Sequence, residues 1–378
     1  MNIIEGTVNM SDFKVCVEKI DSVENHPNAD RLSLIQIKGY TAISAKLEDG
    51  SHRYNPGDLV VYIPCASIVP EYILRDGFWD ESKNKGMLAG SNGDRVKEIR
   101  LRGIFSEGIL LPVVDGKISN QIETISVFLD DDVSEFLGIT KYEPPIPVNM
   151  AGEVYSESRL VKKFDLENIK NHPNVIQPND EVVMTEKIHG TNFRIVIHPN
   201  LKISEAFFDG YVSVTSKGLG NQGLFFKNNQ SNENNLYVKT LKTIEHQISG
   251  ILNVMTEEIM IFGEIYGHGV QDLTYGTKNT EFRVFEVCVN RKWLDWNQLV
   301  DFCKSFDLSM VPVAYIGPYN LEILRGMTDG ITMIENGNNI REGVVVKPIY
   351  EREYQNGRVI FKSVSENYLM RKGATEFN

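Results

Sequence analysis

The sequence contains no long apolar run. No stretch approaches the roughly 20 consecutive apolar residues that a membrane-spanning helix needs. The hydrophobic content of 42% is ordinary for a soluble globular protein. Residues 1–6 lack the basic segment followed by an apolar stretch that a secretory signal would show. We therefore expect a cytosolic protein that has no membrane partner.

Cysteine is scarce. The four cysteines are widely spaced, with no Cys-x-x-Cys pair and no histidine at the spacing of metal ligands; they are Cys16, Cys65, Cys288 and Cys303. Free cysteine is among the most buried residue types. We expect all four to be reduced and mostly buried.

An excess of positive charge is also missing. The 378 residues carry a formal net charge of −12 at pH 7, and the pI is near 5.2. A protein that coats nucleic acid non-specifically needs a broad basic surface. That mode of binding is therefore disfavoured, whereas a local basic groove remains compatible with the charge. The length suits two domains better than one core.

Short strand-like segments separated by turn formers fill the region between residues 12 and 137. The segments 25–30 and 55–58 are rich in residues that favour turns. About five strands in a region of this size fit a small closed barrel better than a sandwich. Residues 125–137 fit a short helix or an extended segment. The five predicted strands are residues 14–20, 32–37, 59–63, 96–103 and 108–113.

Prolines mark a boundary between two domains. The segment 143–148 is rich in proline, which removes backbone donors and holds the chain extended. We predict a domain over residues 1–142, a linker over 143–150 and a second domain over 151–378. The second domain is predicted to be mixed α/β with an antiparallel bias. Its expected elements are a hairpin at 181–197, strands at 212–216, 259–265, 282–287, 343–347 and 358–362, and helices at 236–253 and 296–306.

Lys187 lies between two runs rich in β-branched residues, 182–183 before it and 195–197 after it. This pattern predicts the turn of a buried hairpin. A lysine there loses part of its hydration, which lowers its pKa and increases the fraction of neutral amine that can attack an electrophile. Gly190 would let the backbone approach a bulky ligand closely. The alternative is an ordinary surface lysine in a β-turn.

Further motifs follow Lys187 in a fixed order. They are residues 216–218 (Ser-Lys-Gly), 262–267 (Phe-Gly-Glu-Ile-Tyr-Gly), 283–287 (Arg-Val-Phe-Glu-Val), 341–347 (Arg-Glu-Gly-Val-Val-Val-Lys) and 360–363 (Ile-Phe-Lys-Ser). This order resembles that of the covalent nucleotidyltransferase superfamily, which comprises polynucleotide ligases and RNA capping enzymes. The sequence of residues 186–193 (Glu-Lys-Ile-His-Gly-Thr-Asn-Phe) is most similar to the corresponding motif of the nick-sealing RNA ligases of phage.

The N-terminal region carries a second resemblance. Residues 26–32 (His-Pro-Asn-Ala-Asp-Arg-Leu) and 56–62 (Pro-Gly-Asp-Leu-Val-Val-Tyr) are similar to the OB-fold modules of tRNA-binding domains and of the fifth RNA ligase family. The combination implies an α+β protein: an N-terminal OB-fold β-barrel, then a nucleotidyltransferase (adenylation) domain of antiparallel sheets flanked by helices.

OB barrels bind extended strands through a basic and aromatic face. The candidates for such contacts are Lys97, Arg100 and Arg102, near Arg95. A solvated strand face with charges on alternate positions would show the same pattern, so both interpretations stay open.

The resemblance implies ligation chemistry at Lys187. Its neutral amine would attack the α-phosphate of ATP and expel pyrophosphate, which gives a lysine-AMP phosphoramidate. Negative charge builds up on the phosphate oxygens, so cations must already be in place beside them. Lys347 and Lys362 suit this catalytic role, and their charge would also depress the pKa of Lys187.

The resemblance also implies ligands for the nucleotide and for Mg²⁺ or Mn²⁺. Glu264 matches the glutamate that holds the ribose hydroxyls, and Glu342 matches the one that acts near metal and phosphate. Both are candidate metal ligands, since Mg²⁺ usually touches only one or two carboxylates. Phe285 matches the aromatic residue that stacks on adenine; its alternative is a core residue of a buried strand. Glu186 is grouped with the nucleotide-binding residues.

His189 and Asn192 match positions that the phage ligases use in two later steps. These steps are transfer of AMP to a 5′-phosphate end and attack of a 3′-hydroxyl on that end. Taken without the motif, His189 would be an ordinary polar turn residue. The chain departs from the family pattern at two positions. Lys217, a predicted nucleotide-binding residue, stands where many ligases have an arginine that makes a planar two-pronged contact, and Ile360 stands where a lysine is common.

Three functions are compatible with these motifs. The leading hypothesis is an ATP-dependent RNA ligase that seals 3′-OH/5′-PO₄ breaks, with nicks in duplexes as the expected substrate. The first alternative is a GTP-dependent RNA capping enzyme. The second is a non-catalytic OB-fold protein that binds RNA. We expect RNA or an RNA-containing nicked duplex as the partner, ATP with Mg²⁺ or Mn²⁺ as cofactors, and a monomer.

Overall fold

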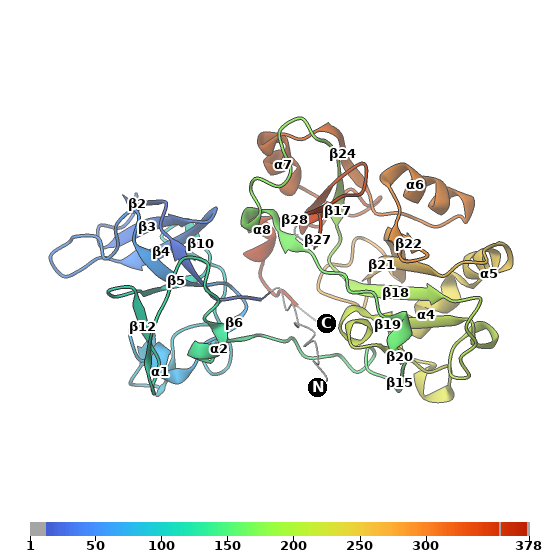
Figure 1. The fold of residues 1–378 in the computed structure, drawn as a ribbon, viewed down its shortest axis with the longest axis horizontal. Helices are drawn as coiled ribbons and strands as arrows, with labels where there is room; N and C mark the ends of the chain where they lie inside the picture. The colour runs from blue at the N-terminus through green and yellow to red at the C-terminus, as the bar shows by residue number, and fades with distance from the viewer. Residues whose placement is uncertain (1–12, 355–356, 376–378) are drawn as a thin grey trace, which may run out of the picture. The chain divides into compact units, whose positions relative to one another are not determined.

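The computed structural model describes residues 13–354 and 357–375. The chain divides into two compact units, Met1–Glu143 and Pro144–Asn378, which Figure 1 shows as a blue to blue-green part and a green to red part. Among the described residues, no helix combines the length and the apolar character that crossing a membrane requires.

Two three-stranded antiparallel sheets form the centre of the first unit, in the orders β1-β5-β11 and β2-β3-β4. Their strands are β1 (Cys16–Lys19), β2 (Ser22–Asn25), β3 (Leu32–Ile37), β4 (Tyr40–Ala45), β5 (Leu59–Ile63) and β11 (Ile109–Pro112). Short pairs add β6 (Ser67–Ile68), β7 (Trp79–Asp80), β8 (Lys85–Gly86), β9 (Ile99–Leu101), β10 (Ile104–Ser106), β12 (Lys117–Ser119), β13 (Thr124–Ser126) and β14 (Thr140–Lys141). The helices α1 (Glu71–Leu74) and α2 (Ser134–Leu137) are each one turn long.

Strand β5 has two buried faces. Val61 and Ile63 pack into one apolar cluster, whereas Val60 and Tyr62 pack into another. Successive side chains of a strand point to opposite faces, so β5 joins the two clusters. This double burial explains why residues 59–63 form a nearly continuous apolar run.

Two five-stranded sheets organise the second unit, and we refer to them as sheet one and sheet two. Sheet one has the order β16-β28-β25-β17-β24, and sheet two has the order β19-β18-β21-β22-β23. Sheet one contains β16 (Glu167–Asn168), β17 (Glu181–Lys187), β24 (Val313–Pro318), β25 (Gly343–Pro348) and β28 (Phe361–Val364). Sheet two contains β18 (Thr191–Ile197), β19 (Val212–Ser216), β21 (Ile259–Gly267), β22 (Thr280–Val289) and β23 (Lys292–Trp293). Two further pairs are β15 (Val154–Ser156) with β20 (Leu224–Phe226), and β26 (Glu353–Tyr354) with β27 (Gly357–Arg358).

The predicted hairpin at residues 181–197 is wrong in its pairing. Strand β17 pairs with β24 and β25, whereas β18 pairs with β19 and β21. Residues 188–190 therefore carry the chain from sheet one to sheet two, as the two green arrows in Figure 1 show. The partners of these strands lie far along the chain, so the local pattern of apolar residues does not reveal them.

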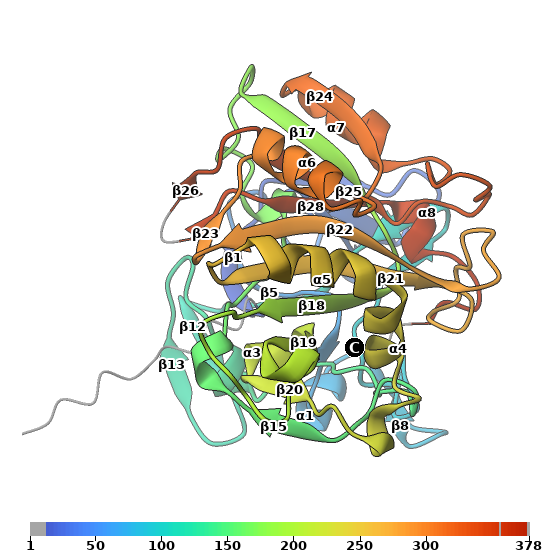
Figure 2. The same ribbon diagram turned by 90° about the vertical axis from the view of Figure 1, so that its right-hand side faces the viewer.

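Helices cover one face of sheet two, as Figure 2 shows for α4, α5 and α6. The predicted helix over 236–253 is interrupted at Ile244, which gives α4 (Leu236–Thr243) and α5 (Glu245–Val254). The predicted helix at 296–306 is present as α6 (Trp296–Ser305). The remaining elements are α3 (Lys217–Asn221), α7 (Leu321–Thr328), α8 (Glu366–Leu369) and the 3₁₀ turns Ser158–Leu160, Ile169–Asn171, Phe208–Gly210 and Gln230–Asn232.

The two faces of sheet two bury different clusters. Ile195, Ile261 and Val287 face the core that the helices cover. Phe262 and Cys288 face a second cluster, which also holds Phe164, Trp293 and, from the segment before β28, Ile360. The second face is the one on which the candidate site lies.

Candidate active site

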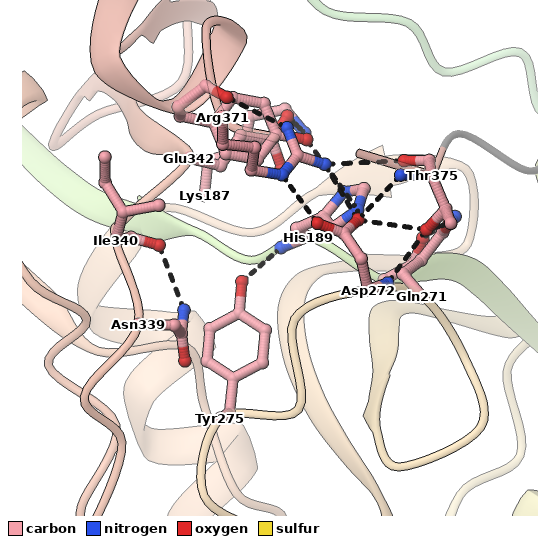
Figure 3. Close-up of polar contacts among 12 residues, drawn as sticks. Lys187, His189, Gln271, Asp272, Tyr275, Asn339, Ile340, Glu342, Arg371 and Thr375 are labelled. Atoms are coloured by element: carbon pink, nitrogen blue, oxygen red, sulfur yellow. Dashed lines mark hydrogen bonds and ion pairs between the residues drawn. The ribbon is translucent and has the colours of Figure 1, made fainter. Parts of the chain in front are cut away.

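Lys187 forms an ion pair with Glu342. Its Nζ lies 2.7 Å from Oε1 of Glu342, and the two side chains are 24% and 11% exposed. The register of the sheet brings them together, because Lys187 at the end of β17 lies opposite Gly343, the residue after Glu342. Figure 3 shows the pair beside the cluster around His189.

The pKa of Lys187 lies above its ordinary value. Burial lowers this pKa, but the negative charges of Glu342 and Glu264 outweigh burial. The expectation that neighbouring lysines depress the pKa of Lys187 is therefore wrong for the nucleotide-free protein. The physical reason is that carboxylates, rather than cations, dominate the surroundings of Nζ.

Glu264 lies on β21, opposite Asn192 on β18. Burial raises the pKa of Glu264 to about 8, although the charge of Lys187 acts in the opposite direction. The side chain is thus a carboxylic acid for much of the neutral range. Asn192 accepts a hydrogen bond from Nε of Arg194 at 3.3 Å, and both residues lie on the same face of β18 because they are two positions apart.

Gly190 is needed for packing between strands. A Cβ at this position would lie 2.0 Å from the carbonyl oxygen of Ile265, so the close approach is to β21. The structure therefore gives a reason for Gly190 within the protein, and the close approach of the backbone to a ligand stays a prediction.

Two more of the predicted cations act on the same site. Burial, together with the positive charges of Lys187 and Lys217, lowers the pKa of Lys362 to about 8. Lys217 forms an ion pair with Asp165. Sequence reasoning missed Asp165, which lies outside every motif.

Lys347 is engaged elsewhere. It is buried, and its Nζ lies 2.6 Å from Glu286 and 3.3 Å from Glu351. Arg358 donates to both carboxylates. Lys347 pairs with Val183, four positions along β17 from Lys187, so a spacing of about 3.3 Å per residue places it on the order of 13 Å away along the sheet. Its phosphate-binding role stays a prediction.

Both oxygens of the Glu186 carboxylate accept hydrogen bonds from within the protein. They accept hydrogen bonds from the Thr332 hydroxyl and from the backbone N–H of Met333, each at 2.6 Å. Burial raises its pKa. This buried carboxylate anchors the segment before β25 to the end of β17. Its part in nucleotide binding stays a prediction.

Phe285 occupies a β-bulge. Glu286 lies opposite Phe262 and Val284 lies opposite Gly263, so Phe285 is the extra residue in β22. Bulges re-aim side chains and are common next to active sites. The ring stacks on Phe164 with centroids 5.6 Å apart and an interplanar angle of 24°. The structure thus gives Phe285 a partner that sequence reasoning missed.

His189 is the centre of a hydrogen-bonded cluster that also contains Asp272, Tyr368 and Arg371. The cluster is drawn in Figure 3. None of these three partners belongs to a predicted motif, and no local signal could have revealed residues 83 to 182 positions away.

The carboxylates fit a divalent cation that phosphate oxygens help to bind. Oε2 of Glu342 is buried and has no hydrogen-bond partner within the described part of the chain. No three His, Cys, Asp or Glu side chains in that part are arranged as a complete metal site. Mg²⁺ keeps several waters and needs only one or two carboxylates plus substrate phosphates, so Glu264 and Glu342 suffice.

Comparison with protein-family models gives two matches. Residues 180–364 match the RNA ligase family, and residues 14–113 match an OB-fold domain. The first match covers sheet two, all of sheet one except β16, and the predicted motifs from Lys187 to Ser363. The predicted order of an OB-fold unit followed by a ligase domain of antiparallel sheets and helices is confirmed.

Solved structures of the RNA ligase of Naegleria gruberi are similar over nearly the whole chain. A lysine-to-alanine mutant with ATP and Mn has a TM-score of 0.72 and 21% sequence identity, and the match covers 94% of this chain and 98% of that chain. The same ligase with PPi has a TM-score of 0.71 and 22% identity, over 94% and 97% of the two chains. The shared fold thus includes both units, and the family match over residues 180–364 shows that the second unit contains a ligase domain of the RNA ligase family.

Proposed function

We propose that this RNA ligase uses ATP to join 3′-OH and 5′-PO₄ ends of RNA at nicks in duplexes, as a cytosolic monomer, through a covalent lysyl-AMP on Lys187. The observation that carries the proposal is the placement of Lys187 against Glu342 at 2.7 Å. Glu264 and Lys362 act electrostatically on the same amine. A lysine set among these groups is a nucleophile whose protonation the site controls.

The first step forms one bond and breaks another. Neutral Nζ of Lys187 attacks the α-phosphorus of ATP, a P–N bond forms, and the bond to the pyrophosphate oxygen breaks. The proton on Nζ must leave to solvent beforehand, and it leaves more easily once another cation draws away the charge of the Glu342 carboxylate, which lies 2.7 Å from Nζ. Lys362 and Lys217 supply positive charge for the phosphate oxygens.

Glu264 and Glu342 would hold a divalent cation, which neutralises charge on the phosphate oxygens when it is bound. Two observations support ATP and a divalent metal as cofactors. One is the unpartnered Oε2 of Glu342. The other is that a similar ligase was solved with ATP and Mn.

In the later steps, AMP passes from Lys187 to the 5′-phosphate end, and the 3′-hydroxyl then displaces AMP. We assign His189 and Asn192 to these steps. Two positions support this assignment: Asn192 lies across the ladder from Glu264, and His189 is two residues from the nucleophile.

Adduct formation tests the first step. Purified protein with Mg²⁺ and α-labelled ATP should give an acid-stable labelled adduct that Lys187→Ala abolishes. Labelled GTP should compete poorly. A preference for GTP would indicate capping, and the absence of any adduct would indicate a protein that only binds RNA.

Ligation of four nicked duplexes tests the substrate. In these duplexes each side of the nick is RNA or DNA, and we expect the 3′-hydroxyl side to need RNA, because the 2′-hydroxyl distinguishes the two polymers. Equal sealing of an all-DNA nick would contradict this. The exposed Arg100 and Arg102 of the OB-fold unit are the proposed RNA contacts, and their replacement by alanine should flatten the salt dependence of binding.

A further inference from the structure

The segment that follows β28 packs onto the loop that carries Asp272. Asp272 receives hydrogen bonds from Nε and Nη2 of Arg371 at 2.7 and 2.9 Å. The backbone N–H and the hydroxyl of Thr375 donate to the same carboxylate, each at 2.9 Å. In return, the backbone N–H of Asp272 donates to the Thr375 hydroxyl at 2.8 Å. Figure 3 shows these contacts converging on Asp272.

Such a set of donors fixes a carboxylate in both position and charge. Burial raises the pKa of Asp272, but the hydrogen bonds from His189, Arg371 and Thr375 bring it well below its usual range. Asp272 is thus an ionised, immobile acceptor. The two-pronged contact from Arg371 also sets the plane of the carboxylate, because a guanidinium binds a carboxylate with fixed geometry.

The ring of His189 is held at both nitrogens. Nε2 lies 2.9 Å from Oδ1 of Asp272, and Nδ1 lies 2.8 Å from the hydroxyl of Tyr368. An ionised carboxylate can only accept, so the proton of the neutral ring is on Nε2 and Nδ1 accepts from Tyr368. Nη2 of Arg371 lies 3.1 Å from Nε2 and also donates to Oδ1 of Asp272 at 2.9 Å.

The backbone around the ring is fixed as well. The N–H of His189 donates to the hydroxyl of Tyr275 at 2.6 Å, and Gln271 donates to the carbonyl of Gly190 at 3.2 Å. Arg371 also lies over the ring of Tyr368, with its Cζ 3.8 Å from the centroid. These contacts fix the orientation of the imidazole, and the contact with the Asp272 carboxylate favours the tautomer with its proton on Nε2.

We propose that Asp272, fixed by Arg371 and Thr375, is a positioning residue that orients His189 for the RNA-joining steps. The inference rests on the proposed role of His189 in those steps. In other enzymes, an aspartate holds a catalytic histidine in the tautomer and orientation that its reaction needs. In this chain the segment 368–375 supplies the groups that hold that aspartate, so it is part of the site.

Asp272→Asn is the direct test. The amide keeps the size of the side chain, but its NH₂ group can donate to Nε2 and favour the other tautomer. With a nicked RNA duplex whose 5′ end is already adenylylated, sealing should be slower by about 10- to 100-fold, the usual cost of losing such a supporting contact. Formation of lysyl-AMP from ATP should change less than about twofold, because His189 acts only after that step.

Two further variants keep the test decisive if Asp272→Asn folds poorly. Arg371→Lys and Tyr368→Phe should show the same split between sealing and lysyl-AMP formation. Arg352→Ala, which removes an ion pair with Asp180, the residue before β17, should affect neither step. Ring ¹⁵N NMR of His189 should show Nε2–H in the wild type and a shifted tautomer in Asp272→Asn.

Equal losses in both steps, or sealing at the wild-type rate, would overturn the positioning role. Failure of the wild type to form lysyl-AMP or to seal the nick would instead overturn the proposed function. The two failures are therefore distinguishable in one set of assays.

Discussion

Nζ of Lys187 and Oε1 of Glu342 lie 2.7 Å apart, so the predicted nucleophile is held in an ion pair before any nucleotide arrives. An amine in an ion pair is protonated and does not attack phosphorus. The site thus keeps Lys187 inactive until the Glu342 carboxylate is drawn to another cation. Formation of the lysyl-AMP adduct therefore depends on which cation the Glu342 carboxylate is paired with.

The pH dependence of lysyl-AMP formation should follow from this pair. The raised pKa of Lys187 means that kcat/KM for adduct formation, which reports the free enzyme, rises with pH up to that pKa. Glu342→Gln removes the negative charge, so the rising limb should move to lower pH, although the maximal rate also falls. Labelled-adduct assays at a series of pH values measure the rising limb of the profile. If Glu342→Gln leaves this limb at the same pH, Glu342 does not set the pKa of Lys187.

Glu264 should make the stability of the protein fall as the pH rises from 4.5 to about 8. Its pKa is about 8 in the folded protein against 4.5 ordinarily. A raised acid pKa contributes stability that is fully present below the unfolded pKa and is lost as pH rises through the folded pKa. We expect the Tm of the wild type to fall relative to Glu264→Gln as the pH rises from 4.5 to about 8. Parallel Tm curves for the two proteins would contradict a raised pKa.

Lys347→Met should mainly cost stability. Removing one partner of a buried ion pair leaves Glu286 less compensated, at a cost on the order of 3 kcal/mol. Urea unfolding measures the free energy, and the exposed Lys304→Met is the matched control. The double variant Lys347→Met with Glu286→Gln should recover part of the loss. Normal stability combined with lost adduct formation would instead support the predicted phosphate-binding role.

Gly190→Ala should disturb the junction beside the nucleophile. The added Cβ would meet the Ile265 carbonyl at 2.0 Å, and such overpacking costs roughly 1–3 kcal/mol. Gly218→Ala is the control, since no atom lies within 4 Å of its added Cβ. That control should be neutral or stabilise α3 by up to about 1 kcal/mol. Equal free energies of unfolding for the two variants would contradict the contact.

Local patterns predicted single strands well. The bounds of β3, β5 and β19 are those expected from residues 32–37, 59–63 and 212–216, because period-two alternation or a short apolar run is written into the strand itself. The pairing of β17 and β18 could not be predicted in the same way. Each strand finds its partners by register with distant strands.

The residues of the candidate site could likewise be predicted in part, whereas their contacts could not. The motif order brought Lys187, Glu342, Glu264, Lys362 and Lys217 into one electrostatic neighbourhood. Motifs do not show which carboxylate pairs with an amine, so the sequence predicted a lowered pKa for Lys187, whereas the pKa is raised. The support of His189 by Asp272 and Arg371 could not be foreseen either, because it joins segments with no pattern in common.

The bulge at Phe285 has a consequence for insertions and deletions. Glu286 and Val284 face consecutive residues of β21, so a chain lacking Phe285 would keep both pairings and a regular ladder. Deleting this residue from β22 would therefore leave the register between β21 and β22 unchanged on both sides of the deletion. The aromatic ring that we expect against adenine comes from a position that the sheet itself does not require.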